Sequence, residues 1–310
     1  MSSQPIETIL PEIRDRIAFL VETAVSNGST ISVDELRSLM PINRFPTGGV
    51  LKQFLTTDER LSRLLAEVKG EITLRGKEDL AEGRQSQRVL AHTRLAQADD
   101  FLRRLGRFCP WIELAGISGS TAYAGTKPED DLDFFLVVER RRLWISLLLA
   151  MATARFLRLR SKSSPVYCFN RVVERADCEL TFRATREPLF AREALNLVVL
   201  RGNGLYGHLL ASAGWIERLF PRLFAMRLND AGEADDTPRA EHGVTGTLAN
   251  AAAFLVLGPY LWLAGLIRNV RLRKAGRERE CFRAVVRTDH YATESTLYDE
   301  LREEYRRALA

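Results

Sequence analysis

The chain has few of the residues from which disulfide frameworks, thiolate or histidine metal sites and hydrolase triads are built. Its 310 residues include four cysteines, none in a Cys-x-x-Cys pair, and four histidines without metal-ligand spacing. Free thiols in a reducing cytoplasm are the expected state. The sequence also has no Ser-His-Asp arrangement and no Walker A lysine motif. No apolar core follows a basic start at the N-terminus, so no signal peptide is predicted.

The net charge of the chain does little to narrow the kinds of molecule it could bind. The formal net charge is +5, the isoelectric point is near 9.2, and charged residues make up 27% of the chain. This mild basicity permits a nucleotide, a nucleic acid or an acidic lipid as partner without requiring one. With a hydrophobic fraction of 46%, the chain is long and apolar enough for two domains, or for one domain with appendages.

The first part, residues 1–84, has the pattern of a winged-helix-like module. Ser32 to Glu35 forms a capping box at a helix start, and two short strand patterns flank Lys69-Gly70, which is a hairpin signal. A DNA-binding version should present a basic surface. Residues 1–82 instead hold 10 Lys and Arg against 13 Asp and Glu, which favours a packing or protein-contact role and argues against DNA binding.

The second part, residues 85–200, is predicted as the functional core. A long helix precedes a strand at 111–118, and a Ser-Gly-Ser turn ends that strand. A second strand follows at 131–138, then a helix at 143–157 and a third strand at 165–173. The turn therefore lies about a dozen residues ahead of two aspartates that open the second strand.

This turn and the aspartate pair predict a site for a metal ion and a phosphate group. Side chains alternate along a strand, so Asp131 and Asp133 should point the same way, about 7 Å apart. Two carboxylates beside an apolar strand repel each other and lose hydration, which a bridging divalent cation such as Mg²⁺ would offset. Gly119 lets a ligand approach the backbone, and the amides that follow it can bind a phosphate together with the Ser120 hydroxyl.

The same residues carry a resemblance to a known family. Gly119-Ser120, ten intervening residues and then Asp131-Leu132-Asp133-Phe134 resembles the signature of the polymerase-β-type nucleotidyltransferase superfamily. The segments "GEITLRGKEDLAEGR", "RRLW", "YCFN" and "LFAREALNL" are similar to a group of bacterial nucleotidyltransferase-domain proteins whose substrates are largely undefined. The resemblance covers the chain from about Glu71 onward.

The resemblance implies an α+β fold, with a mixed sheet flanked by helices, and a defined chemistry. In this superfamily two Mg²⁺ ions assist the attack of a hydroxyl acceptor on the α-phosphate of a nucleoside triphosphate. By analogy Asp131 and Asp133 ligate the metal ions, and Ser120, with Gly119, binds the β- and γ-phosphates. The acceptor and the identity of the nucleotide are left open.

The third strand departs from the family pattern, in which a third carboxylate activates the attacking hydroxyl. Asn170 holds the central position, cannot act as a base, and is assigned here to nucleotide binding. Glu174 at the strand end is the preferred substitute, ahead of Glu179. This departure supports an alternative hypothesis, in which the chain is a catalytically weak or inactive module of the same fold that binds a nucleotide or a protein partner.

Two basic residues near the motif are assigned to the triphosphate. Lys127 lies in the loop between the turn and the aspartates, and Arg142 ends the run Arg140-Arg141-Arg142 after the second strand. Either side chain can neutralise phosphate charge. The alternative for the arginine run is a solvated helix start, although arginine at that end of a helix is not favoured by the dipole.

The third part, residues 201–310, is predicted to be mostly helical, and residues 291–310 form an amphipathic surface helix. Residues 243–267 contain no charge and precede a basic run. A buried helix or homo-oligomer contact is preferred, with a kink or break at Pro259 and with Leu261 and Leu266 packed against the body. The other readings are membrane-surface contact through 243–274, peripheral at the inner face of the membrane, and a transmembrane span.

Overall fold

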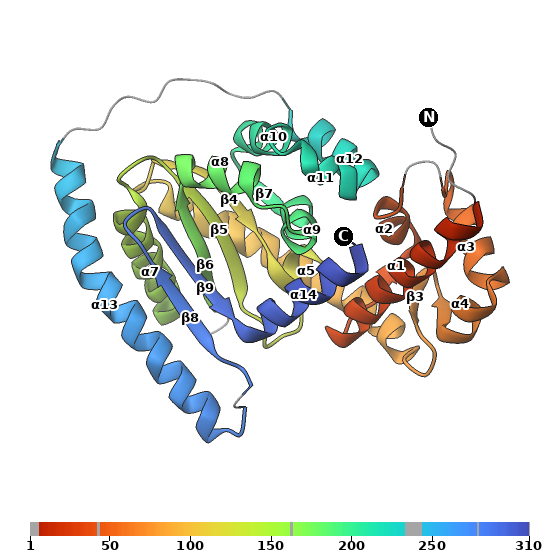
Figure 1. Cartoon of the computed structure of the whole chain (residues 1–310). Helices are drawn as coiled ribbons and strands as arrows, with labels where there is room; N and C mark the ends of the chain where they lie inside the picture. Colours follow the sequence, from red (N-terminus) through yellow and green to blue (C-terminus); the bar gives the residue numbers. More distant parts are fainter. Residues whose placement is uncertain (1–5, 42–43, 162–163, 233–243, 278, 310) are drawn as a thin grey trace.

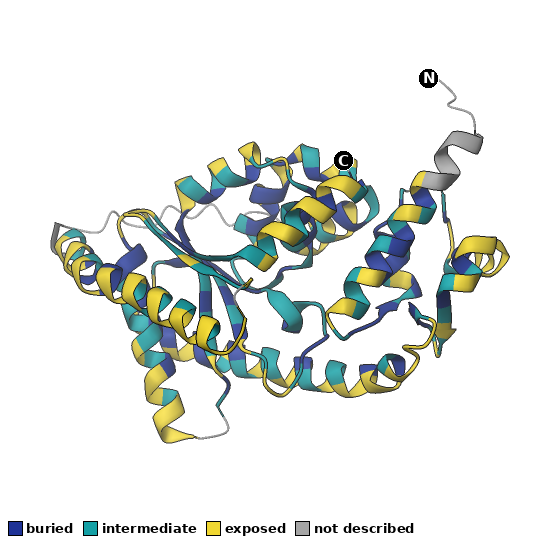
Figure 2. Cartoon of the chain, turned by 60° about the horizontal axis from the view of Figure 1, so that its bottom comes forward, coloured by how far each residue is buried: buried dark blue, intermediate teal, exposed yellow. Residues whose placement is uncertain are grey.

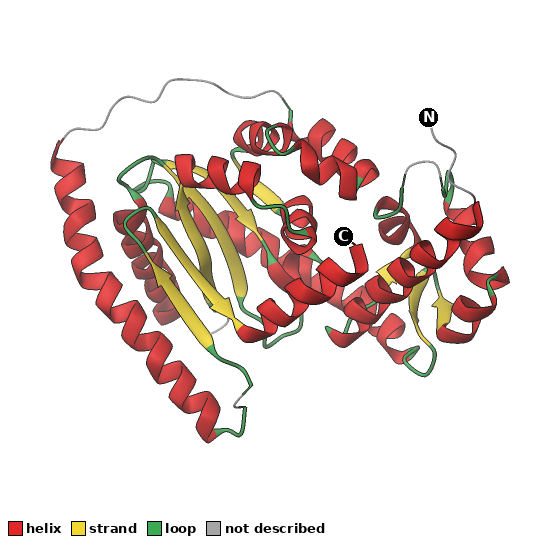
Figure 3. Ribbon diagram, viewed as in Figure 1, coloured by secondary structure: helices red, strands yellow, loops and turns green. Residues whose placement is uncertain are grey.

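The computed structural model describes residues 6–41, 44–161, 164–232, 244–277 and 279–309. A six-stranded mixed sheet lies between two layers of helices, and a three-stranded sheet with its own helices lies at the N-terminal end (Figures 1 and 3). The α+β class expected from the sequence is therefore confirmed.

The N-terminal module combines four helices with a small antiparallel sheet of order β1-β3-β2. The capping box forms as predicted: the Glu35 amide donates to Ser32 Oγ at 3.2 Å, and the Ser32 amide donates to the Glu35 carboxylate at 2.8 Å. The elements, in chain order, are α1 (Ile6–Ser26), β1 (Ile31–Ser32), α2 (Val33–Ser38), α3 (Gly48–Thr57), α4 (Glu59–Leu64), β2 (Leu65–Val68) and β3 (Glu71–Leu74).

Basic side chains on α3 and α4 are paired with carboxylates of the same module. Lys52 pairs with Glu67 of β2, Arg60 pairs with Asp15 of α1 at 2.7 Å, and Arg63 pairs with Glu59 at 2.6 Å. These pairs agree with the net acidic charge of the segment and give the two helices a neutralised outer surface at these positions.

The central sheet has the strand order β7-β4-β5-β6-β9-β8. Only β5 and β6 are parallel, and the helix α7 connects them; the other neighbouring pairs are antiparallel. Both β5 and β6 therefore begin at the same edge of the sheet. The strands are β4 (Ile112–Ile117), β5 (Leu132–Val138), β6 (Tyr167–Glu174), β7 (Val198–Arg201), β8 (Phe282–Val286) and β9 (His290–Ser295).

Alternation along β5 assigns its side chains to two separate cores. Phe134 and Leu136 belong to the core on the side of α5, α7 and α13, whereas Val137 belongs to the core on the side of α8 to α12. The remaining helices are α5 (Asp79–Leu105), α6 (Gly119–Ala122), α7 (Leu143–Arg160), α8 (Arg175–Ala184), α9 (Pro188–Asn196), α10 (Asn203–Ala211), α11 (Gly214–Leu219), α12 (Pro221–Ala231), α13 (Val244–Lys274) and α14 (Thr296–Leu309).

The last part of the chain is less helical than predicted. Residues 282–295 supply β8 and β9, which extend the central sheet beyond β6. The predicted surface helix at 291–310 therefore begins only at Thr296, and Tyr305 and Leu309 of that helix are buried. The predicted division at residue 201 does not separate a domain, because β9 completes the sheet that the second part begins.

The apolar segment forms one continuous helix, α13, which runs through Pro259 without a break. The helix is not broken at Pro259, because this residue removes only one backbone donor and lies on the exposed side of the helix, and a kink there stays a prediction. By length and composition alone, 246–274 could cross a membrane, and 22% of its apolar window is buried. Leu261 packs against the sheet as predicted, but Leu266 is 43% exposed. The prediction of a buried helix holds only for the inner side of α13.

Candidate functional site

The Gly-Ser turn lies directly beside the start of β5. The Ser118 amide donates to the Asp133 carbonyl oxygen at 3.0 Å, so the end of β4 and the beginning of β5 are held together at the turn. Gly119 has φ +66°, and a Cβ at this position would overlap Asp133 Oδ2. Glycine is required here for both the backbone conformation and the close approach. The structure therefore brings together the turn and carboxylate that the sequence predicts.

Asp133 is a partly buried carboxylate in an environment that disfavours its charge. Burial raises the pKa of Asp133 to about 7, and the neighbouring Asp131 carboxylate also raises it. A hydrogen bond from Asn170 Nδ2 to Asp133 Oδ1, at 2.6 Å, lowers the pKa but does not cancel the effect of burial. Asp131 itself precedes β5 and is exposed.

Asn170 is held in one orientation by its neighbours. Its amide oxygen accepts a hydrogen bond from Thr293 Oγ1 at 3.0 Å and one from Cys168 Sγ at 3.0 Å. Its Nδ2 group is therefore the one that faces Asp133. Asn170 thus lies beside Asp133 as a donor to its carboxylate, whereas the sequence assigns it to nucleotide binding, and the network extends from β5 through β6 to β9.

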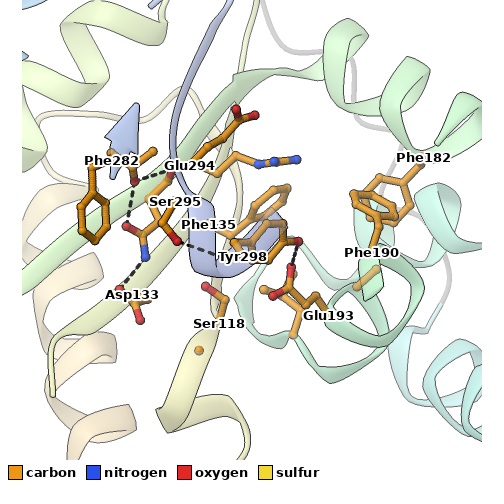
Figure 4. A pocket seen from close by; sticks show the side chains of 16 residues that line it. Ser118, Asp133, Phe135, Phe182, Phe190, Glu193, Phe282, Glu294, Ser295 and Tyr298 are labelled. Carbon is orange, nitrogen blue, oxygen red and sulfur yellow. Dashed lines mark hydrogen bonds between the residues drawn. The ribbon is translucent and has the colours of Figure 1, made fainter. Parts of the chain in front are cut away.

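A cavity of about 270 Å³ opens at Asp133. Figure 4 shows Asp133 and Ser118 on one side of it, Tyr298 near its centre, and Phe182 and Phe190 on the other side. Its remaining lining combines apolar residues such as Phe135, Leu197 and Phe282 with polar and charged ones that include Arg171 and Glu294. Glu193 accepts a hydrogen bond from the Tyr298 hydroxyl at 2.6 Å, and burial raises the pKa of Glu193 above its ordinary value.

A second cavity, of about 490 Å³, lies on the other side of the turn. It shares Gly119 and Glu193 with the first cavity, and its polar lining includes Ser120, Lys127 and Arg192. The structure therefore places Gly119, Ser120 and Lys127, three of the five residues that the sequence assigns to nucleotide binding, around one space. The two cavities meet at the turn, and both contain charges of each sign: Arg171 lines the first beside its carboxylates, and Glu35 and Asp130 line the second beside its cations.

Arg84 attaches the N-terminal module to the loop that follows the turn. Its guanidinium donates to the carbonyl oxygens of Tyr123 and Ala124, at 3.0 and 2.6 Å, and to Ser29 Oγ at 2.8 Å. The second cavity is accordingly lined by both the module and the core. The module contributes to the walls of the site, which the sequence does not predict.

Three predicted site residues lie elsewhere, and these assignments are wrong. Cys168 pairs with Asp133 whereas Glu174 pairs with Val138, so Glu174 lies at the opposite end of the parallel strands, about 20 Å away by strand geometry. The Arg141 amide donates to the Glu174 carboxylate at 2.6 Å. Arg142 is buried at that same end, where its guanidinium lies 5.5 Å from the centre of the Trp111 ring.

The second choice for the third carboxylate, Glu179, also lies outside the site. It is on α8, where it pairs with Arg175 at 2.9 Å, and it lines neither cavity beside the turn. Face alternation leads to the choice of Glu174, because it assigns a residue to a side of the sheet but not to an end of the strand. Glu179 is the second choice because of its nearness in the sequence, and α8 carries it away from the sheet edge at Asp133.

The residues at the turn fit a magnesium site of the kind that a substrate completes. Within the described ranges, no group of three or more His, Cys, Asp or Glu side chains is arranged to hold a metal ion. Mg²⁺, however, is usually held by one or two carboxylates together with substrate phosphates. Asp133 would provide one carboxylate, and its partly buried charge is the kind that a cation stabilises. Asp131 would provide the second, although it is exposed and lines neither cavity.

Several residues of the site are not predicted from the sequence. Arg192 and Glu193 come from α9, Thr293 from β9 and Tyr298 from α14. The only local signal is the adjacent pair Arg192-Glu193 within an apolar helix pattern. The other two reach the site because β9 pairs with β6, more than a hundred residues away in the chain.

Comparison with known proteins gives no relative from which a function could be transferred. No protein-family model, no curated protein and no solved structure matches this chain. The site is therefore interpreted from its geometry and chemistry, and from the resemblance in its sequence motif.

Proposed function

We propose that the protein is a Mg²⁺-dependent nucleotidyltransferase that moves a nucleoside monophosphate from a nucleoside triphosphate to a hydroxyl acceptor. One observation carries the proposal: the glycine turn lies directly against the Asp133 carboxylate, at the point where two cavities meet. Phosphoryl and nucleotidyl transfer depend mainly on positioning the phosphates and neutralising their charge. The turn offers backbone amides that can position phosphates, and the cavities offer charged side chains that can neutralise them, directly or through a metal ion.

Each side of the turn has its own role in the proposed reaction. Asp131 and Asp133 would hold Mg²⁺, two ions by analogy with the superfamily, and the metal would supply charge neutralisation at the α-phosphate. Ser120, Lys127 and Arg192 bind the outer phosphates in the larger cavity. Asn170 orients the Asp133 carboxylate through the 2.6 Å hydrogen bond.

The smaller cavity offers surfaces for the rest of the substrate. Phe135, Phe182 and Phe190 line it, and their ring faces provide stacking surfaces for a nucleobase. Besides Asp133, the carboxylates that line this cavity are Glu193 and Glu294. They replace Glu174 and Glu179 as the carboxylates available to an acceptor hydroxyl.

A second function is favoured by one specific residue. Asn170 stands on β6 where the superfamily places its third carboxylate, and its amide group donates to Asp133 instead of accepting a proton. A protein with this arrangement can bind a magnesium nucleotide without transferring it. In that case the chain is a nucleotide-binding module, and a partner protein binds its nucleotide-bound form.

Labelled triphosphates distinguish the two functions. Each of the four nucleoside triphosphates, labelled at the α-phosphate, is incubated with the protein, Mg²⁺ and a cell extract, and labelled product and pyrophosphate are measured. Transfer predicts a labelled product with the parent protein and with the control variant Glu174→Gln, but not with Asp131→Asn. Nucleotide binding without pyrophosphate release supports the second function. Absence of both Mg²⁺-dependent binding and turnover would overturn the site assignment.

A further inference from the structure

The outer side of α13 is an unusually apolar surface. Nine of the nineteen large apolar side chains that are exposed in the described part of the chain lie on this one helix. Figure 2 shows exposed residues along the length of α13. Exposed apolar patches of this extent mark contact surfaces in soluble proteins. The nine residues are Leu248, Leu255, Val256, Tyr260, Trp262, Leu263, Leu266, Ile267 and Val270.

Basic residues gather at one end of this surface. The helices α7 and α13 have no acidic residue, and their basic residues all lie in their C-terminal portions. The α7 helix ends at the sheet edge where β5 and β6 begin, because it connects these parallel strands. The basic residues are Arg155, Arg158 and Arg160 of α7, and Arg268, Arg271, Arg273 and Lys274 of α13.

A groove joins the apolar surface to the basic end. It has a volume of about 640 Å³ and lies between α7 and α13, with β6, β8 and β9 lining its floor. Its walls are mainly aliphatic and aromatic, while Arg155, Arg158 and Arg268 contribute the charged part of its lining. None of these three arginines forms an ion pair with an acidic side chain of the described residues. Burial raises the pKa of Asp131 whereas Arg268 and Arg158 lower it, so both arginines lie near that carboxylate, and the Arg268 guanidinium lies 3.4 Å from the centre of the Phe282 ring. The groove thus combines an apolar wall with arginines that are available to an anion.

Both ends of α13 are attached to the same side of the core. Near its start, Asn250 Oδ1 accepts hydrogen bonds from the amides of Trp144 and Ile145, at 2.8 and 3.2 Å. Near its end, Asn269 bonds to both the amide and the carbonyl of Phe282 in β8, at 2.7 and 2.8 Å. Spanning a bilayer would require α13 to leave α7 and β8, whereas lying on a surface leaves every one of these contacts intact.

We infer that the outer side of α13 docks on the surface of an anionic lipid bilayer, with Arg155, Arg158 and Arg268 bound to lipid phosphates. An interfacial helix combines an exposed apolar side with basic residues in this way, and anionic lipids attract clustered arginines near the membrane surface. This docking does not depend on the reaction at the glycine turn.

The charge pattern favours a bilayer over a second copy of the chain. Two copies that covered the apolar surface by pairing α13 with α13 would each bring their own basic ends, without an acidic residue on these helices to meet them. In an anionic bilayer, by contrast, negatively charged phosphates lie directly beside the apolar acyl region, so one surface can bind both the arginines and the apolar side of α13.

Vesicle sedimentation of the full chain tests the inference. The parent should sediment with vesicles of phosphatidylglycerol and phosphatidylcholine, but not with phosphatidylcholine alone, and high salt should weaken the binding. Leu255→Asp with Trp262→Asp should abolish it without changing the melting curve, because both side chains are more than half exposed. The matched control is Leu180→Asp with Val89→Asp, which adds the same charges at equally exposed positions elsewhere.

A charge series makes the test quantitative. Replacing Arg155, Arg158 and Arg268 by Gln should lower partition into anionic vesicles about 100-fold, at about fivefold for each cation. The control removes Arg60, Arg63 and Lys69 in the same way and should retain most of the binding. Equal losses in both series, or no binding of the parent to anionic vesicles, would overturn the inference. So would a dimer in sedimentation velocity that Leu255→Asp with Trp262→Asp dissociates, or extraction that only detergent achieves.

Discussion

Each end of the parallel strands β5 and β6 carries an acidic residue, and the two ends differ in the partners that bind its carboxylate. At one end Asp133 lies beside Asn170, and at the other Glu174 lies beside the Arg140 to Arg142 run. Glu174 accepts the Arg141 amide at 2.6 Å, and Arg142 is buried over the Trp111 ring. Asp133 instead faces a cavity, and its Oδ2 lies against the bare Cα of Gly119.

The difference shows that an acidic residue close to arginines in the sequence does not by itself indicate a ligand-binding site. At the Glu174 end the polar groups bond to the chain itself, and they stabilise the start of α7. At the Asp133 end a partly buried carboxylate remains available to a ligand, next to a turn that admits one. Substitutions at the two ends should therefore affect different measurements.

The largest expected effect is on turnover at the cavity end. Asp133→Asn removes a proposed metal ligand and should lower Mg²⁺-dependent turnover more than about 100-fold, beyond the loss typical of residues that only support a ligand. Since burial and Asp131 both disfavour the Asp133 charge, the unfolding temperature should be equal to or above that of the parent. Steady-state kinetics and a melting curve check both parts. Parent-like turnover would remove Asp133 from the site.

A smaller loss is expected when the support of that carboxylate is removed. Asn170→Ala deletes the donor to Asp133 Oδ1 and should lower turnover roughly 10- to 100-fold while the fold is retained. Raising the Mg²⁺ concentration should recover part of the loss, because the carboxylate remains. A variant that responds to Mg²⁺ like the parent would show that Asn170 has no role in positioning the ligand.

At the opposite end the expected effect is on stability. Glu174→Ala leaves the Arg141 amide without its acceptor and should lower the free energy of unfolding by about 1–3 kcal/mol. Turnover of the folded variant should stay within about twofold of the parent, since Glu174 lies far from the turn. Urea unfolding and kinetics below the melting temperature measure the two quantities. A selective loss of turnover would restore Glu174 as the third carboxylate.

The smallest effect concerns the pH dependence of stability at Glu193. Burial raises the pKa of this carboxyl in the folded state, so the folded protein binds the proton more tightly than the unfolded chain. Stability should therefore fall as pH rises from the ordinary pKa of glutamate through the raised value. Glu193→Gln removes this dependence, and the stability of the parent relative to the variant should decrease as pH rises above the ordinary pKa of glutamate. An unchanged difference would contradict the assigned environment.

Local sequence signals predict the part of the site that is local in the chain. The spacing from Gly119 to Asp133 predicts the turn, the strand and their proximity, because β4 and β5 are consecutive antiparallel strands. Contributions from distant segments are not predicted. Thr293 and Tyr298 reach the cavity only because β9 pairs with β6 and α14 follows it. Alternation likewise cannot show that Glu174 lies at the wrong end of β6.

The orientation of α13 illustrates the same limit. Its composition is compatible with a buried, an interfacial or a spanning helix, and no pattern along the helix distinguishes them. The structure does so through Asn250 and Asn269, which attach its two ends to Trp144 and Phe282. Both asparagines are isolated polar residues in an apolar helix, and their partners lie outside it.

Equilibrium binding of a triphosphate analogue with a non-hydrolysable link between the α- and β-phosphates is the most direct test of the proposed site. Affinity should be measured with Mg²⁺ and with a chelator for the parent, for Asp131→Asn with Asp133→Asn, and for Glu174→Gln. The proposed site predicts Mg²⁺-dependent binding that the double variant loses and Glu174→Gln retains. Binding by the double variant at the parental affinity, or loss of binding in Glu174→Gln alone, would contradict it.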